Sequence, residues 1–202
     1  GLDAEMAVMT TDTRPKQACV KTVIGGKRVT IGGMCKGSGM IEPNMATMLG
    51  FITTDAAIAP AMLKRALVIA ISKSFNRVVV DGDESTNDSV FLMASGLADN
   101  PEIRKSGEDF RAFADALTTV CVSLAKQMAA DGEGATKFVT VTVKGARSEA
   151  DAARAARAVA KSPLAKTSWF GKDPNWGRVL AAVGYSGAEV TDMKTEVFYD
   201  RE

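Results

Sequence analysis

A glycine pair between two short β-like runs constrains the fold of this chain more than any other feature. Residues 20–24 and 27–31 are rich in β-branched residues, and Gly25-Gly26 joins them. Two consecutive residues that tolerate positive φ form the tight turns that connect antiparallel strands. The sequence therefore predicts a β-hairpin close to the N-terminal end of the chain.

Helical patterns follow this hairpin. Apolar residues recur at helical spacing through 61–75, where Pro60 favours the first turn, and 110–130 is typical of a second long helix. Further helices are predicted at 90–97, 148–161 and 175–184, and further strands at 4–10, 77–81, 137–144, 188–190 and 194–199. This alternation predicts a mixed α/β fold in layers.

Composition narrows the class of protein. The 202 residues are 46% hydrophobic and 24% charged, which is typical of a globular domain, and no linker or repeat divides them. We therefore expect residues 1–202 to form a single α/β domain. The net charge of +1 gives no electrostatic reason to expect nucleic-acid or membrane partners, and the apolar stretch 66–71 is too short to cross a bilayer.

The cysteines and the first residues indicate the setting. Cys19, Cys35 and Cys121 are odd in number and lack a CxxC spacing, which favours a reducing, cytoplasmic compartment. Cys35 is expected to be a small buried hydrophobe, although the neighbouring Lys36 could activate its thiol. The start has no initiator Met and no secretory signal, so we expect an interior part of a longer gene product.

The chain contains no histidine, which limits its nucleophilic chemistry. Serine and cysteine nucleophiles usually use an imidazole as their base, and histidine-ligated zinc is excluded as well. An N-terminal threonine instead carries its own base, an α-amine whose reference pKa is roughly 8. In the run KGSGMIEPNMATML, Thr47 follows a turn at Pro43 and would gain such an amine if the bond after Ala46 were cut.

That cut has a simple chemistry. The Thr47 hydroxyl attacks the Ala46 carbonyl, the acyl group shifts from nitrogen to oxygen, and water hydrolyses the ester. Small Ala46 leaves its carbonyl open, and the turn could hold the peptide near the attack geometry. From the spacing alone, however, a threonine in a short apolar run is more often an ordinary strand residue.

Several longer blocks carry a family resemblance. MTTDTRPK at 9–16, KGSGMIEPNMATMLGFITTDA at 36–56, VDGDESTND at 80–88, DGEGATK at 131–137 and DPNWGR at 173–178 resemble the ornithine acetyltransferases, also called glutamate N-acetyltransferases. The resemblance covers almost the whole chain. It implies a layered sandwich of mixed β-sheets flanked by helices, an α/β/β/α arrangement of the N-terminal-nucleophile type.

The resemblance also implies a site and a processing event. The family's self-cleavage motif falls on Ala46 and Thr47, which gives an α fragment that ends with residues 1–46 and a β fragment that begins with 47–202. Thr47 is then the catalytic nucleophile. Thr10, Lys36 and Glu133 fall at the family's substrate contacts, where lysine can bind a carboxylate and glutamate an ammonium.

The activity implied is acetyl transfer in arginine biosynthesis, from N2-acetylornithine to glutamate through an acetyl-threonine intermediate. No metal or organic cofactor is expected, and acetyl-CoA is an alternative acetyl donor in the family. The implied partners are these small molecules, the two fragments of one precursor, and further αβ units of a homo-oligomer. The family's oxyanion pair has no counterpart within this chain. A related self-processing aminopeptidase or amidohydrolase and an unprocessed, non-catalytic module remain as alternatives.

Two weaker patterns stay open. GGMCKGSG at 32–39 resembles a phosphate-binding loop but lacks the P-loop spacing. The acidic cluster of Asp81, Asp83, Glu84 and Asp88 could bind a divalent cation, but a turn in which the carboxylates cap backbone amides is favoured.

Overall fold

The chain forms two compact units, Gly1–Glu133 and Gly134–Glu202, each of which is described by itself. The structure is a computed structural model, and it describes residues 1–42, 48–83, 85–191 and 194–199. The single domain expected for residues 1–202 stays a prediction.

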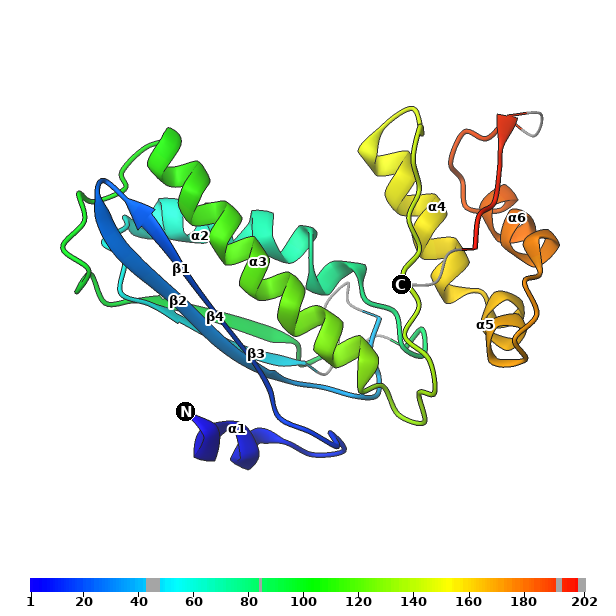
Figure 1. The fold of residues 1–202 in the computed structure, drawn as a ribbon, viewed down its shortest axis with the longest axis horizontal. Helices are drawn as coiled ribbons and strands as arrows, with labels where there is room; N and C mark the ends of the chain where they lie inside the picture. The colour runs from blue at the N-terminus through cyan, green and yellow to red at the C-terminus, as the bar shows by residue number, and fades with distance from the viewer. Residues whose placement is uncertain (43–47, 84, 192–193, 200–202) are drawn as a thin grey trace. The chain divides into compact units, whose positions relative to one another are not determined.

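A mixed four-stranded sheet forms the framework of the first unit (Figure 1). Its strands follow the chain order β1-β2-β3-β4, with the β1–β2 and β2–β3 pairs antiparallel and the β3–β4 pair parallel. The bounds are Lys16–Ile24 for β1, Lys27–Lys36 for β2, Leu49–Thr54 for β3 and Ser89–Ala94 for β4. The mixed α/β class is confirmed, and the described residues contain this one sheet of the predicted sandwich.

The predicted hairpin is confirmed. Ile24 pairs with Lys27 across a turn in which Gly25 and Gly26 have φ values of 54° and 77°. A side chain at Gly25 is disfavoured by this positive φ and also by a clash, because a Cβ there would lie 2.5 Å from the ring of Pro101. Backbone conformation and a close neighbour therefore both require glycine at this corner.

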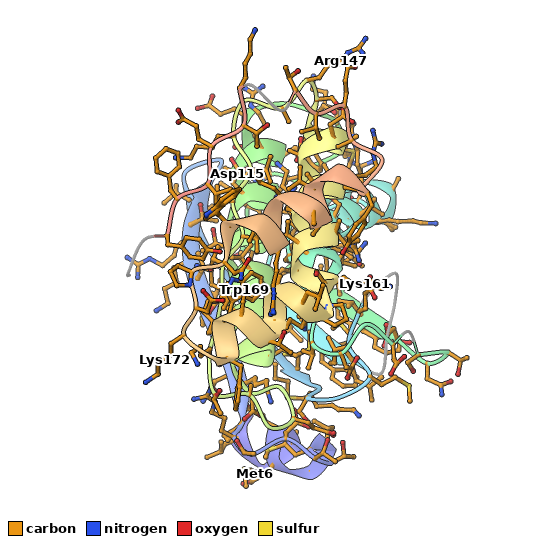
Figure 2. The ribbon with its side chains drawn as sticks, turned by 90° about the vertical axis from the view of Figure 1, so that its right-hand side faces the viewer. Met6, Asp115, Arg147, Lys161, Trp169 and Lys172 are labelled. Atoms are coloured by element: carbon orange, nitrogen blue, oxygen red, sulfur yellow. The ribbon has the colours of Figure 1, made fainter. Side chains whose placement is uncertain are left out.

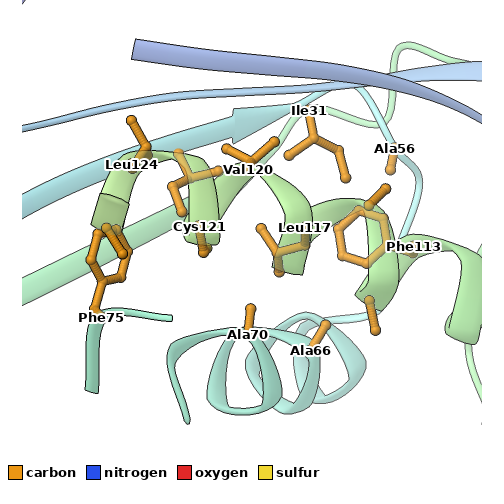
Figure 3. Packing of buried hydrophobic residues seen from close by; sticks show 14 of the residues in the cluster. Ile31, Ala56, Ala66, Ala70, Phe75, Phe113, Leu117, Val120, Cys121 and Leu124 are labelled. Atoms are coloured by element: carbon orange, nitrogen blue, oxygen red, sulfur yellow. The ribbon is translucent and has the colours of Figure 1, made fainter. Parts of the chain in front are cut away.

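Two helices cover one face of the sheet, α2 at Pro60–Ser72 and α3 at Glu108–Ala130 (Figure 1). Figure 3 shows Leu117 and Val120 of α3 between the sheet and α2, while Ala66 and Ala70 of α2 face α3. These four side chains are fully buried, and the two alanines are small enough to let the helices approach closely. Both helices were predicted from their periodicity, within a few residues at their ends.

Aromatic and other apolar side chains lie on the opposite face of the sheet. Phe51 of β3 stacks on Phe91 of β4, with ring centroids 5.5 Å apart. Phe91 and Met93 nevertheless stay about half exposed, whereas Ile31 and Ile52 on the helix-covered face are fully buried. Alternation along each strand thus separates a covered face from an open one.

The second unit consists of three helices, α4 at Glu149–Lys161, α5 at Pro163–Phe170 and α6 at Trp176–Gly184. Lys161 marks the end of α4 and Trp169 lies on α5 (Figure 2). The Ser148 hydroxyl caps α4 by accepting the Asp151 N–H at 3.1 Å. Helices α4 and α6 were predicted. Helix α5 was missed, although Ser162 followed by Pro163 is a typical helix start.

Other predicted elements were wrong. Residues 4–10 were expected to form a strand, but Leu2–Val8 is helix α1, whose first turn carries the acidic Asp3 and Glu5 that favour a helix N-terminus. Residues 90–97 were expected to be helical and instead contain β4, because a short apolar run fits a strand as well as a helix.

Residues 77–81 do not form the expected strand. Their first residue, Arg77, ends the 3₁₀ helix Phe75–Arg77, and the Val80 N–H donates to the Ile41 carbonyl at 2.6 Å. Residues 137–144 are largely exposed and pair with no strand in the described part of the chain. The described residues of 188–190 and 194–199 form no strand either. Alternation without a partner strand to pair with is not sufficient for a β-strand.

No helix in the described ranges is long and apolar enough to cross a membrane.

Candidate functional site

Three strand ends meet at one edge of the sheet and define the candidate site. The register places Lys36, the last residue of β2, opposite Leu49, the first residue of β3, and Leu49 opposite Ser89, the first residue of β4. The segments that adjoin these ends, Gly37, Met48 and Asp88, are therefore neighbours. Ala46 and Thr47 lie outside the described residues, two positions and one position before Met48 in the chain, respectively.

The Lys36 side chain is the cation at this edge. It is buried, with 8% of its surface exposed, and its Nζ donates a hydrogen bond to Thr10 Oγ1 at 3.4 Å. Within the described part of the chain, no carboxylate lies within 4.0 Å of this ammonium group. A buried cation with no described carboxylate within 4.0 Å is suited to binding an anionic ligand. Thr10 and Lys36, predicted from separate blocks, are thus in contact.

Glu133 reaches the same loop from the end of α3. Its N–H donates to the Ser38 carbonyl at 2.8 Å. Its carboxylate lies directly over Gly39, where an added Cβ would be 2.6 Å from the Glu133 Cδ. The structure therefore places the predicted acidic contact against the loop that begins at Lys36, and glycine at position 39 makes room for it.

A buried ion network lies beneath this loop. The Lys16 ammonium contacts Asp12 Oδ1 at 2.5 Å and Asp131 Oδ2 at 2.6 Å, and only 1% of the Lys16 surface is exposed. Thr13 donates to Asp131 through its N–H at 3.0 Å and also through its hydroxyl. Burial alone would raise the pKa values of both aspartates. The hydrogen bonds and the Lys16 charge outweigh burial and hold both pKa values below the ordinary range.

This network positions the residues of the candidate site. Asp12 accepts the Gly37 N–H at 2.7 Å and the Thr10 N–H at 3.3 Å, so one carboxylate holds the backbone of both predicted substrate contacts, Thr10 and Lys36. Asp131 lies two residues before Glu133. This arrangement was not predicted from the sequence, because Asp12 and Lys16 are four residues apart in a segment that is not helical, and no local rule pairs them there.

The acidic cluster after residue 80 divides into two kinds of carboxylate. Asp81 accepts the backbone N–H groups of Met40 at 2.6 Å, Ile41 at 2.9 Å and Asp83 at 3.1 Å. Amide capping, the favoured prediction, is therefore confirmed for Asp81. No group of side chains suited to hold a metal ion occurs in the part of the chain that the structure describes.

Asp88 differs from Asp81. Its Oδ1 accepts the Met48 N–H at 2.7 Å, while its Oδ2 is buried and has no hydrogen-bond partner among the described residues. Burial raises the pKa of Asp88 to about 6, and the Met48 N–H and the charge of Lys36 oppose this rise. The sequence shows Asp88 as one of four acidic residues in a cluster, and nothing local distinguishes it from the others.

The thiols offer no competing nucleophile at this edge. Cys35 is buried, and burial raises its pKa to about 12. Burial likewise raises the pKa of Cys121 to about 12. A thiol with such a pKa carries almost no thiolate at neutral pH, which confirms Cys35 as a small core residue.

Comparison with known proteins decides the family. Residues 2–202 match the family model described as the ArgJ family. The chain belongs to the ArgJ family. This match extends over both compact units and includes every block on which the resemblance was based.

Several ArgJ proteins are close in sequence. The chain is 61% identical over 198 residues to the arginine biosynthesis bifunctional protein ArgJ of Symbiobacterium thermophilum, covering 98% of this chain and 49% of that protein. It is 56% identical over 194 residues to the protein of the same name from Geobacter sulfurreducens, covering 96% of this chain and 49% of that protein. The chain thus spans about half the length of these curated relatives.

A solved ArgJ structure supports the same assignment. The crystal structure of the arginine biosynthesis bifunctional protein ArgJ from Bacillus halodurans matches with a TM-score of 0.70 at 49% identity. The match covers 72% of this chain and 68% of that one.

Proposed function

We propose that this chain is part of a self-cleaving acetyltransferase of arginine biosynthesis that moves acetyl from N2-acetylornithine to glutamate. The observation that carries the proposal is the meeting of Lys36, Thr10 and Glu133 at one loop, beside the strand end that Thr47 precedes by two residues. Membership of the ArgJ family supports the same reaction.

The charges at this loop suit the substrates. A substrate α-carboxylate would pair with the Lys36 ammonium, which contacts no carboxylate in the described part of the chain. The ornithine side-chain ammonium would pair with the Glu133 carboxylate. The Lys36 ammonium donates a hydrogen bond to Thr10 Oγ1 at 3.4 Å, so the Thr10 hydroxyl orients the cation and can contact the same carboxylate.

The reaction follows a ping-pong course. The α-amine of mature Thr47 takes the hydroxyl proton as Oγ1 attacks the acetyl carbon, and it then returns that proton to the leaving ornithine nitrogen. Glutamate enters and attacks the acetyl-threonine ester, which forms N-acetylglutamate and frees Thr47. These steps need no metal or organic cofactor, and acetyl-CoA would be an alternative donor to the same Thr47 oxygen.

The cleavage itself is the first test. Intact-mass analysis of the full-length gene product is expected to show two fragments that meet between Ala46 and Thr47, and Thr47→Ala is expected to leave one chain. Loss of the nucleophile should also remove acetyl exchange between N2-acetylornithine and labelled glutamate, by at least ~10⁴-fold. An uncut wild-type chain would contradict the proposal. Acetate release that does not need glutamate would instead indicate the amidohydrolase.

A second test addresses the position of Glu133. Gly39→Ala places a Cβ 2.6 Å from the Glu133 carboxyl carbon, at the flexible end of that side chain, so the carboxylate must move while the backbone can stay. We expect KM for N2-acetylornithine to rise about tenfold, equivalent to ~1.4 kcal/mol of binding. The melting temperature should change little.

Gly107→Ala is the matched control for that variant. A Cβ at position 107 meets no atom within 4 Å, and the residue lies in the same compact unit at the start of α3. Its KM should equal that of the wild type. Unchanged KM in Gly39→Ala would rule out Glu133 as the contact for the substrate ammonium.

A further inference from the structure

Asp88 holds the peptide unit that follows the proposed nucleophile. Its Oδ1 accepts the Met48 N–H at 2.7 Å, and the nitrogen of that N–H is covalently bonded to the carbonyl carbon of Thr47. The next residue adds a second bond, because the Ser89 N–H donates to the Met48 carbonyl at 3.1 Å. Met48 is thus fixed on both of its backbone polar groups by the start of β4.

The second oxygen of Asp88 is left without a described partner. Only 9% of the Asp88 surface is exposed, and Oδ2 is fully buried with no hydrogen-bond donor in the described part of the chain. A buried carboxylate oxygen without a donor costs about 1–3 kcal/mol or more, and a role in proton transfer is one explanation for such a group. Asp81 shows the alternative, because its two oxygens accept three backbone N–H groups.

The cleavage step needs a base that accepts the proton of the Thr47 hydroxyl. Before the cut, the Thr47 nitrogen is part of a peptide bond and cannot take a proton, and the chain contains no histidine. Lys36, the charged side chain that acts on Asp88, is a cation and would favour the carboxylate form. Among carboxylates, one with a pKa of about 6 is ionised at neutral pH yet more basic than an ordinary aspartate.

We propose that Asp88 is the general base of self-cleavage, with Oδ1 fixing the Thr47–Met48 peptide and Oδ2 taking the proton of the Thr47 hydroxyl. This inference rests on the proposed function, since it assumes the cut between Ala46 and Thr47. It assigns a chemical role to the one carboxylate of the acidic cluster that joins the strand end next to Thr47.

The step balances without a co-reactant other than water. A bond forms between Thr47 Oγ1 and the Ala46 carbonyl carbon as the hydroxyl proton passes to Asp88. The tetrahedral intermediate then breaks its bond to the Thr47 nitrogen, and Asp88 returns the proton to that nitrogen. The products are an ester and a free α-amine. Water then hydrolyses the ester and restores the Thr47 hydroxyl.

The test follows the rate of cleavage in the full-length precursor made by cell-free synthesis. Asp88→Asn keeps an oxygen that can accept the Met48 N–H and has nearly the same size, but it cannot take a proton at neutral pH. We expect its cleavage rate to fall at least ~100-fold, the lower range for loss of a general base. Asp88→Ala also removes the acceptor and should be at least as slow.

Asp55→Asn is the matched control. Asp55 Oδ1 accepts the Thr30 N–H at the same 2.7 Å, but it follows the other end of β3. This variant should be cut at the wild-type rate. An Asp88→Asn precursor that is folded and is cut within about threefold of the wild-type rate would overturn the proposal.

A pH profile supplies a readout that does not depend on the variants folding. The wild-type cleavage rate is expected to rise through about pH 6, as Asp88 ionises, and then to level off. A rate that is flat across this range would overturn the role of Asp88. If Thr47→Ala blocks cleavage while Asp88→Asn does not, only this inference fails; if the wild type is not cut, the proposed function fails as well.

Discussion

The Lys16 network and Asp88 are two buried acidic sites at the same edge of one sheet, and the pKa values of their aspartates are shifted in opposite directions. Asp12 and Asp131 share the Lys16 ammonium and several N–H or O–H donors, which hold their pKa values low. Among the described residues, Asp88 has one N–H donor for its two oxygens, and burial raises its pKa to about 6. The number of donors, rather than burial itself, separates the two cases.

The comparison separates structural from chemical roles. Carboxylates whose lone pairs are occupied serve to hold the chain, here the backbone of Thr10 and Gly37. A carboxylate that keeps one oxygen free and a pKa near neutrality can exchange a proton during a reaction. Residue type alone does not reveal this difference, because all three residues are aspartates in conspicuous polar blocks.

The largest expected effect comes from removing Lys16, the cation that Asp12 and Asp131 share. Lys16→Met leaves Asp12 and Asp131 buried without their counter-ion, and we expect the free energy of unfolding to fall by ~3–5 kcal/mol. Urea denaturation of the full-length protein in a Thr47→Ala background measures the loss on an uncut chain. Lys21→Met, at an exposed lysine of the same strand, should change stability by less than about 0.5 kcal/mol. A loss below about 1 kcal/mol for Lys16→Met would show that the network is not what holds this edge together.

A smaller effect on stability is expected from Asp88. Because folding raises the pKa of Asp88, the native state binds its proton more tightly than the unfolded state does. That contribution is present below about pH 4 and is lost as the pH rises through about 6. Asp88→Asn in the Thr47→Ala background should therefore be more stable than its parent at pH 7, by ~1–3 kcal/mol.

The same pair of proteins should converge at low pH. Urea denaturation at pH 4, 5, 6 and 7 is expected to show the advantage of Asp88→Asn growing through this range. An advantage that is equally large at pH 4, or a loss of stability at pH 7, would mean that Oδ2 finds a strong donor in the native protein.

Local sequence patterns were sufficient for the hairpin and for α2 and α3. The Gly25-Gly26 turn and the long apolar periodicities depend on neighbours within one turn or a few helical turns, which a single sequence displays. Strand β4 was predicted as helix, because its assignment depends on parallel pairing with β3, about 40 residues earlier in the chain. Nothing within residues 90–97 themselves encodes that partner.

The site was predictable to a different extent. Family blocks gave Thr10, Lys36 and Glu133, and the structure brings these three to one loop. The contacts that place them were not predictable, because Asp12 binds the Gly37 N–H across 25 residues and Lys16 binds Asp131 across 115. Asp88 was visible only as one member of an acidic cluster. Its position beside Met48 depends on the register of β3 against β4.

Because β2 pairs with β3, a cut between these strands would make folding a reaction between two chains. A cut after Ala46 would leave β1 and β2 in one fragment and β3, β4 and α3 in the other, while the pairs from Ile31–Thr54 to Lys36–Leu49 still join them in one sheet. Unfolding would then release two chains instead of one. The stability of the processed protein would depend on its concentration, as it does for an obligate dimer, and dilution alone would slow its refolding after denaturation.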